Sequence, residues 1–268
     1  MADRFTKMHG LGNDFVVIDA REQAVAMTPA RAHAIADRRH GIGCDQLILL
    51  EPSTSADVKM RIFNADGGEV EACGNATRCV ATLLGKPAVI ETLGGMLRVT
   101  PADGGAEVVL GEPVFDWEHI PLAMPMDTRD MPVAWDELER GAAVNVGNPH
   151  VIFFVPEADA VPLADLGPRI ETDPLFPERV NVNVASLDGE DQLQLRVWER
   201  GVGLTQACGT GACATAVAAI RAGLVKSPVT ISLPGGDLVI RWAPGEPIVM
   251  SGAATRVYDG ETDWTQFG

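Results

Sequence analysis

Two cysteines of this chain stand in the same local sequence. The first lies in Ala72-Cys73-Gly74-Asn75, and the second lies 135 residues later in Ala207-Cys208-Gly209-Thr210. Two like thiols on opposite sides of a carbon atom can invert its configuration, because one removes a proton from one face while the other supplies a proton to the other face. The pair therefore indicates stereoinversion, with Cys73 and Cys208 exchanging the roles of base and acid.

The same offset of 135 residues relates other positions of the two halves. It pairs Gly12-Asn13 with Gly147-Asn148, Val16 with Val151, Arg61 with Arg196 and Gly68 with Gly203. The sequence thus predicts a duplication, in which two similar domains bring equivalent residues to a common cleft from opposite sides.

Each cysteine precedes a run of small residues that predicts the start of a helix, with Asn75 and Thr210 as the expected N-cap residues. The first-turn N–H groups of such helices can hold a carboxylate. Their positive potential is also expected to lower the pKa of each thiol from about 8.5 toward neutrality. The two helix starts could therefore both bind the carboxylate of an amino acid and activate the two thiols.

The other three cysteines, Cys44, Cys79 and Cys213, lack this context and are expected to be small buried side chains. An odd total of 5 cysteines favours reduced thiols over a disulfide framework. Cysteine spacings typical of zinc sites do not occur, so we expect no bound metal.

Composition narrows the classes of partner. Asp and Glu number 37 against 21 Lys and Arg, and the formal charge of -16 disfavours binding to nucleic acid or to anionic membranes. The amino-terminal sequence Met1-Ala2-Asp3-Arg4 does not resemble a signal peptide, and no apolar run has membrane-spanning length. We therefore expect a cytoplasmic protein.

Short strand-like runs recur in both halves and alternate with few helices. In the first half they are Phe15 to Ile18, Leu47 to Leu50, Val58 to Phe63, Val89 to Thr92, Leu97 to Thr100 and Glu107 to Leu110. In the second half they are Val151 to Val155, Val180 to Val184, Leu193 to Trp198, Val229 to Leu233, Leu238 to Trp242 and Ile248 to Met250. Hairpin signals follow both cysteine regions, at Leu93-Gly94-Gly95 and at Leu233-Pro234-Gly235-Gly236.

Three helices are expected, from Asn75 to Leu84, from Gly209 to about Arg221 and from Pro29 to about Arg39. The second of these is apolar nearly all round, which is typical of a helix buried inside surrounding sheet. The first is similarly apolar except for Arg78. The Pro-rich region from Pro113 to Pro132 is interpreted as a linker.

The segment Gly209 to Ala214 matches a loose GxGxxA dinucleotide pattern. That fingerprint requires a strand leading directly into the first glycine and an acidic residue about twenty positions on, and neither condition is met. Among the histidines, His150 lies in Gly147-Asn148-Pro149-His150, which the offset aligns with Gly12-Asn13-Asp14-Phe15. The offset also pairs Gln46 with Asn181 and Asn64 with Glu199, which places amides where a polar substrate could be bound.

Taken together, these motifs resemble the diaminopimelate epimerases, which need no pyridoxal phosphate. The resemblance covers nearly the whole chain and includes Met8 to Phe15, Gly41 to Gln46, Phe63 to Gly67, Ala72 to Asn75, Gly147 to His150, Arg179 to Asn181, Glu199 to Gly201 and Thr205 to Ala212. Leu204, Cys44 and Ala76-Thr77 depart from the commonest family pattern, and none of them occupies a position with a carried-over role.

The resemblance implies interconversion of LL- and meso-diaminopimelate, in lysine and peptidoglycan precursor synthesis, without a cofactor or metal. It implies an α+β fold of two pseudo-symmetric domains, each a mostly antiparallel sheet wrapped around a central helix, with the active site in the interdomain cleft. We expect one domain at residues 1–116, completed by 255–268, and the other at 117–254. A homodimer is also implied.

The resemblance further assigns roles to individual residues. Cys73 and Cys208 are the acid/base pair, and His150 and Glu199 assist the thiols. The reacting carboxylate is expected on the backbone of Gly74, Asn75, Gly209 and Thr210, and the rest of the substrate on Asn13, Gln46, Asn64, Asn148, Asn181, Glu199 and Arg200. Arg200 can bind a distal carboxylate bidentately.

Two other functions compete with this hypothesis. A thiol redox or peroxide sensor would cycle through a Cys73–Cys208 disulfide, although the chain has no CxxC motif. A sister activity on the same fold, such as proline racemisation or hydroxyproline epimerisation, would use the same two thiols, although Arg200 and the amides favour a substrate with a second charged end. Substrate-free oxidation is expected to join the two thiols and to be reversed by reductant.

Overall fold

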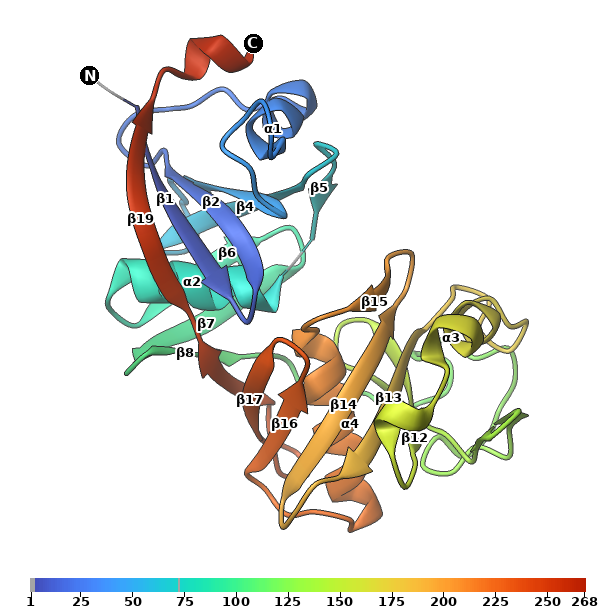
Figure 1. Ribbon diagram of the computed structural model, residues 1–268. Helices are drawn as coiled ribbons and strands as arrows, with labels where there is room; N and C mark the ends of the chain where they lie inside the picture. The colour runs from blue at the N-terminus through green and yellow to red at the C-terminus, as the bar shows by residue number, and fades with distance from the viewer. Residues whose placement is uncertain (1–2, 72) are drawn as a thin grey trace. The chain divides into compact units, whose positions relative to one another are not determined.

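The computed structural model describes residues 3–71 and 73–268, which form two compact units (Figure 1). The first unit extends to Val108 and takes up the C-terminal segment Gly252–Gly268, and the second unit is Val109–Ser251. The boundaries expected at residues 116 and 254 fall inside the second and the first unit, respectively. Met1, Ala2 and Ala72, which entered the sequence analysis, lie outside the described residues.

The first unit is a mixed sheet with a central helix. Its strands are β1 (Asp3–Gly10), β2 (Asn13–Asp19), β3 (Gln46–Glu51), β4 (Val58–Asn64), β5 (Glu69–Val70), β6 (Ala88–Thr92), β7 (Gly95–Ala102), β8 (Gly105–Val109) and β19 (Thr255–Thr262). β1 pairs antiparallel with β2 and with β19, β2 runs parallel to β3, and β3 is antiparallel to β4. β4 then pairs antiparallel with β5 and parallel with β6, which forms a hairpin with β7.

The second unit repeats this plan. Its strands are β9 (Ala134–Trp135), β10 (Leu138–Glu139), β11 (Ala142–Asn145), β12 (Pro149–Phe154), β13 (Asn181–Leu187), β14 (Gln192–Glu199), β15 (Gly203–Thr205), β16 (Val229–Leu233), β17 (Gly236–Arg241) and β18 (Val249–Ala253). From β11 to β17 the pairings occur in the same order and with the same directions as from β1 to β7. This correspondence confirms the predicted duplication, and both predicted hairpins form.

Each unit has one long helix that packs on its sheet. In the first unit α2 (Gly74–Leu84) contacts β1 and β7, and in the second unit α4 (Gly209–Ala222) contacts β11, β12 and β17. Residues 211–219 of α4 are all buried, as its apolar sequence predicted. Both helices end at a glycine in the left-handed conformation, Gly85 with φ 65° and Gly223 with φ 74°, which is a common way to close a helix.

The N-cap residues of these two helices are the cysteines themselves. Cys73 (φ −149°) and Cys208 (φ −122°) have extended backbones, and the following glycine is already helical. The expectation that Asn75 and Thr210 cap the helices is therefore wrong, because each helix begins one residue after its cysteine. This start places each thiol directly at the end of a helix where N–H groups lack intrahelical partners.

Shorter helices flank the sheets: α1 (Pro29–Ala36), α3 (Leu163–Glu171), η1 (Ala158–Ala160) and η2 (Trp264–Phe267). Thr28 caps α1 by accepting a hydrogen bond from the Arg31 N–H at 3.2 Å. α1 ends before the predicted Arg39, because the Asp37 carboxylate accepts the N–H groups of Arg39 and His40 and forms a turn.

The segment from Pro113 to Pro132 is part of the second unit's core. Ile120, Leu122 and Met131 are buried to 4% exposure or less and pack with the apolar side chains of β12 and β13. The interpretation of this segment as a linker is therefore wrong. Its prolines prevent regular structure, but its apolar residues are spaced so that they still reach the core. No helix in the described part of the chain is long and apolar enough to cross a membrane.

Candidate active site

In the first unit, the predicted site residues meet at one edge of the sheet, beside the start of α2. β2 begins at Asn13 and β3 begins at Gln46, and these strands are parallel. β4 is antiparallel to β3 and ends at Asn64, directly opposite Gln46. The side chains of Asn13, Gln46 and Asn64, which are far apart in the sequence, therefore lie together at the ends of these strands.

Cys73 lies against Asn13. The thiol Sγ is 3.7 Å from Asn13 Oδ1, which also accepts a hydrogen bond from Asn75 Nδ2 at 3.4 Å. The other end of the Asn13 amide, Nδ2, donates to the carboxylate of Asp45 at 3.2 Å. Because the NH2 group of Asn13 donates to this carboxylate, the other end of the amide, its oxygen, is directed toward the thiol.

Asp45 belongs to a charged cluster behind Asn13. Arg38 donates to Asp14 at 2.5 Å and to Asp45 at 2.7 Å, and Lys7 donates to Asp14 at 2.5 Å. Burial alone would raise the pKa of Asp14, but the hydrogen bonds from Arg38 and Lys7 outweigh it and hold that pKa well below its usual range. Asp14 therefore stays ionised beside Arg38, and Arg38 in turn holds Asp45 against the Asn13 amide.

Arg78 supports the same half-site from inside the protein. It is fully buried in α2, and its Nη2 donates to Asn75 Oδ1 at 2.6 Å. This contact leaves Asn75 Nδ2 directed to Asn13. Gly10 provides the space for Asn75, since a Cβ on Gly10 would lie 3.2 Å from both the Cβ and the carbonyl oxygen of Asn75.

Gln46 and Asn64 form a second amide pair at this edge. Gln46 Nε2 donates to Asn64 Oδ1 at 2.8 Å, and the buried Gln46 Oε1 has no hydrogen-bond partner among the described residues. A buried acceptor without a partner is costly unless a ligand completes it. Gln46 Oε1 is therefore suited to accept an N–H group of a substrate such as an ammonium.

In the second unit, the equivalent residues again lie at strand ends beside a helix start. Pro149 begins β12 and Asn181 begins β13, with His150 directly opposite Asn181 in a parallel pair. β14 ends at Glu199, and Arg200 follows it. Gly12 and Gly147 both have positive φ, at 83° and 106°, so the turns before β2 and before β12 also correspond.

Cys208 is 4% exposed and has three polar neighbours in its own unit. Its Sγ lies 3.6 Å from Thr210 Oγ1 and accepts the Gly211 N–H at 3.4 Å, and the Glu199 carboxylate lies beside it. Burial raises the pKa of the Cys208 thiol well above its ordinary value, and the charge of Glu199 adds to this effect. The donors on Thr210 and Gly211 act in the opposite direction.

The expectation that the helix start lowers the pKa of both thiols is thus wrong for Cys208, because burial and Glu199 outweigh the helix. Because its pKa is raised, Cys208 is a protonated thiol and can act as a proton donor. Glu199 is the adjacent group that could accept a proton from the thiol.

His150 does not contact the thiol directly. It is fully buried, its Nε2 lies 2.9 Å from Asn148 Oδ1 and its Nδ1 lies 3.1 Å from Asn183 Nδ2. Burial lowers the pKa of His150 to about 3, and the positive charge of Arg200 lowers it further. His150 is therefore neutral at physiological pH and connects two asparagines.

Asn181 and Arg200 are tied to the backbone of this half-site. Asn181 Nδ2 donates to the Pro149 carbonyl at 2.9 Å, and its Oδ1 accepts the Arg200 N–H at 2.9 Å. The Arg200 side chain is exposed and donates through Nη1 to the Glu178 carbonyl at 3.0 Å. Asn181 thus holds the turn that carries Glu199 and Arg200.

The remaining cysteines behave as predicted. Cys44, Cys79 and Cys213 are at most 1% exposed, and burial raises the pKa of Cys44 to about 11 and that of Cys79 to about 12. The described residues contain no cluster of three or more His, Cys, Asp or Glu side chains that could hold a metal ion.

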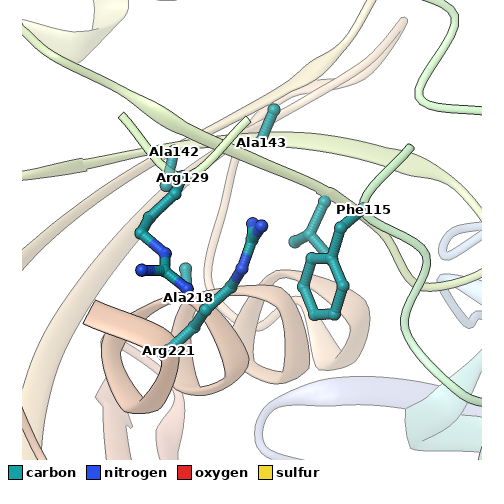
Figure 2. A pocket seen from close by; sticks show the side chains of 7 residues that line it. Phe115, Arg129, Ala142, Ala143, Ala218 and Arg221 are labelled. Carbon is teal, nitrogen blue, oxygen red and sulfur yellow. The ribbon is translucent and has the colours of Figure 1, made fainter. Parts of the chain in front are cut away.

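A shallow recess in the second unit lies at the other end of α4 (Figure 2). It is lined by Phe115, Arg129, Ala142, Ala143, Val144, Ala218 and Arg221. The Arg221 guanidinium packs over the Phe115 ring at 4.3 Å from its centroid, and burial together with the nearby Arg129 lowers the pKa of Arg221. None of the predicted site residues lines this recess.

Sequence reasoning missed Asn183, Asp45 and Gly10. The signal for Asn183 was available, because Asn181-Val182-Asn183 places two amides two residues apart in a strand, where alternate side chains share a face. The roles of Asp45 and Gly10 depend on contacts with Asn13 and Asn75 across the fold, which local patterns do not reveal.

Comparison with known proteins gives consistent results. The sequence model described as diaminopimelate epimerase matches residues 5–115 and 142–257. A diaminopimelate epimerase from Sphingopyxis alaskensis is 92% identical over 268 residues, covering all of both chains. Another from Rhizorhabdus wittichii is 71% identical over 269 residues, covering all of this chain and 98% of the relative.

Among solved structures, a phenazine biosynthesis protein of the PhzF family from Enterococcus faecalis superposes with a TM-score of 0.71 at 14% identity. The match covers 98% of this chain and all of that chain. At this identity the likeness shows a common fold only.

Proposed function

The chain belongs to the diaminopimelate epimerase family and is an isomerase of that type, and from this premise we propose how its two half-sites divide the reaction. LL- and meso-diaminopimelate differ in configuration at one α-carbon. One thiolate removes the α-proton from one face, and the other thiol delivers its proton to the opposite face. Each cysteine ends in the protonation state that the other had, so the reverse reaction uses the same two groups.

The observation that carries this proposal is the repeated placement of a cysteine at the N-cap of the central helix in two units of the same topology. We propose that the two cysteines act on the same α-carbon. The α-carboxylate would accept hydrogen bonds from the N–H groups of Gly74, Asn75, Gly209 and Thr210. The negative charge that develops at the α-carbon in the transition state is then stabilised through this carboxylate.

The surrounding side chains suit the rest of an amino acid with two charged ends. Gln46 Oε1 can accept from an ammonium group, and the exposed Arg200 can bind a distal carboxylate. Asn13, Asn64, Asn148 and Asn181 supply further amides, and Glu199 assists Cys208 from its contact position. His150 would act through Asn148, since its ring nitrogens contact asparagines.

The test is incubation of the enzyme with LL-diaminopimelate in deuterated water. We expect deuterium at one α-carbon together with formation of the meso isomer, and no loss of activity on dialysis against a chelator. Cys73→Ala and Cys208→Ala should each abolish epimerisation. Epimerisation at the wild-type rate in either variant would exclude the two-thiol reaction.

A parallel assay with L-proline and trans-4-hydroxy-L-proline separates this activity from the sister activities. Turnover of these cyclic amino acids in place of diaminopimelate would reassign the substrate. A reversible Cys73–Cys208 disulfide with no effect of diaminopimelate would favour the redox sensor instead.

We also propose a cytoplasmic homodimer. Val257 and Tyr258 on β19 are 55% and 47% exposed, and two neighbouring exposed apolar side chains suit a surface between two copies. Light scattering after size-exclusion chromatography measures the mass directly, and a monomer at micromolar concentration would exclude this assembly.

A further inference from the structure

We propose that Asn183 is a positioning residue that sets the direction of a hydrogen-bond chain ending at Cys208. This proposal rests on the proposed role of Cys208 and adds the residue that orients a hydrogen-bond donor toward its sulfur. All members of the chain belong to the second unit, and each link has an assigned donor and acceptor.

The first link fixes the Asn183 amide. Asn183 Nδ2 lies 3.0 Å from the Val151 carbonyl and 3.3 Å from the Asn181 carbonyl. Carbonyl oxygens only accept hydrogen bonds, so the NH2 group of Asn183 must face them. The same NH2 group lies 3.1 Å from His150 Nδ1, which must therefore be the unprotonated ring nitrogen.

The next links follow from this tautomer. A neutral histidine with unprotonated Nδ1 carries its proton on Nε2, which donates to Asn148 Oδ1 at 2.9 Å. The Asn148 amide is thereby oriented with its Nδ2 toward Thr210 Oγ1, at 3.3 Å. Thr210 Oγ1 accepts this bond, so its own hydrogen is available for Cys208 Sγ at 3.6 Å.

The chain therefore delivers a donor to the sulfur of Cys208. A donor at this place stabilises the thiolate, which burial and the Glu199 carboxylate both disfavour. With the opposite histidine tautomer, Nε2 would be an acceptor and the Asn148 amide would turn over. The Thr210 hydroxyl would then donate to Asn148, and the sulfur would lose this donor.

An unpartnered atom of Asn183 supports a role beyond packing. Asn183 is fully buried, and its Oδ1 has no hydrogen-bond partner among the described residues. Such an oxygen destabilises the fold, so an apolar residue of similar shape would be the better choice for stability alone. The equivalent position in the first unit is the buried, apolar Ile48.

The first unit shows the contrasting arrangement. There the equivalent asparagine, Asn13, is held by Asp45 with its oxygen toward the helix start and the thiol of Cys73. In the second unit, Asn148 presents its NH2 group to the helix start. The two equivalent amides thus have opposite orientations. Asn13 presents an acceptor to Cys73, whereas Asn148 is a link in the chain that presents a donor to Cys208.

The test combines His150 imidazole ¹⁵N chemical shifts with steady-state kinetics on the full chain. We expect wild-type His150 to be protonated at Nε2. Asn183→Leu removes the donor, so both tautomers should be populated, and kcat should fall about ten- to a hundredfold with little change in KM. Asn183→Asp offers an acceptor to Nδ1 and should move the ring proton there, with a similar loss.

Thr215→Val is the matched control. Thr215 is fully buried in α4, its Oγ1 has no hydrogen-bond partner in the described part of the chain, and it takes no part in the chain to Cys208. We expect wild-type tautomer and kinetics for this variant.

The proposal is overturned if Asn183→Leu folds with the wild-type tautomer, or if it shifts the tautomer and keeps the wild-type kcat. Should Asn183→Leu fail to fold, Asn183→Asp gives the same decision. A wild-type enzyme with the Nε2–H tautomer but no activity on diaminopimelate would refute the proposed function and leave the hydrogen-bond chain intact.

Discussion

Replacement of Gly211 by alanine tests how tightly α4 packs against the Asn183 amide. A Cβ at this position would lie 2.7 Å from Asn183 Oδ1, 3.1 Å from Val197 Cγ2 and 3.3 Å from Cys208 Sγ. Alanine favours a helix over glycine by about 1 kcal/mol, but overpacking a buried site costs about 1–3 kcal/mol. We therefore expect a net loss of about 1 kcal/mol, which lowers the midpoint of thermal unfolding by roughly 2–4 °C.

Calorimetry and steady-state kinetics measure the two consequences of Gly211→Ala. The new methyl group should also push Asn183 away from His150. We therefore expect kcat to fall, although a stability loss of about 1 kcal/mol leaves the protein folded. Gly111→Ala is the control, since nothing lies within 4 Å of a Cβ there, and it should leave both quantities unchanged. A higher unfolding midpoint with unaltered kcat for Gly211→Ala would refute the reasoning.

Other predictions concern His150, the thiols and a helix cap. His150 has a folded pKa of about 3, so below its ordinary value of 6.5 the unfolded chain takes up a proton that the folded chain does not. Stability is therefore lost as pH falls, by about 2 kcal/mol between pH 6.5 and 5, and urea titrations should show a smaller loss for His150→Gln. Iodoacetamide should modify the partly exposed Cys73 of the native protein before the buried Cys44 and Cys79, which peptide mass mapping can decide. Thr28→Ala removes the cap of α1 and should cost about 1 kcal/mol in urea unfolding, and an unchanged midpoint would argue against the cap.

The sequence was sufficient for the elements that carry local signals. Short strand-like runs located β3, β4, β6, β13, β14 and β16, and the runs of small residues located α2 and α4. β1 and β19 were missed, since their sequences mix charged, polar and glycine residues that become strands only by pairing with neighbours. β11 was missed because it has only 4 residues and begins with two alanines. α3 was missed because Gly167 and Pro168 interrupt its helical pattern.

For the candidate site, the sequence supplied the residues, and the structure supplied their protonation and orientation. The repeat located Cys208 and His150, but the burial that raises one pKa and lowers the other comes from packing around α4 and β12. The spacing Asn181-Val182-Asn183 was a signal for Asn183, but the orientation of its amide depends on three acceptors collected from β12 and β13.

The division of the chain also bears on its synthesis. β1 pairs with β19, although the whole second unit, Val109–Ser251, lies between them in the sequence. On the ribosome the second unit is therefore complete before the first, reversing the usual N-terminal-first order. Until β19 emerges, one edge of β1 lacks its native partner, and such an edge readily pairs with other chains. We infer that the nascent first unit, rather than the second, is the part that needs protection from aggregation during translation.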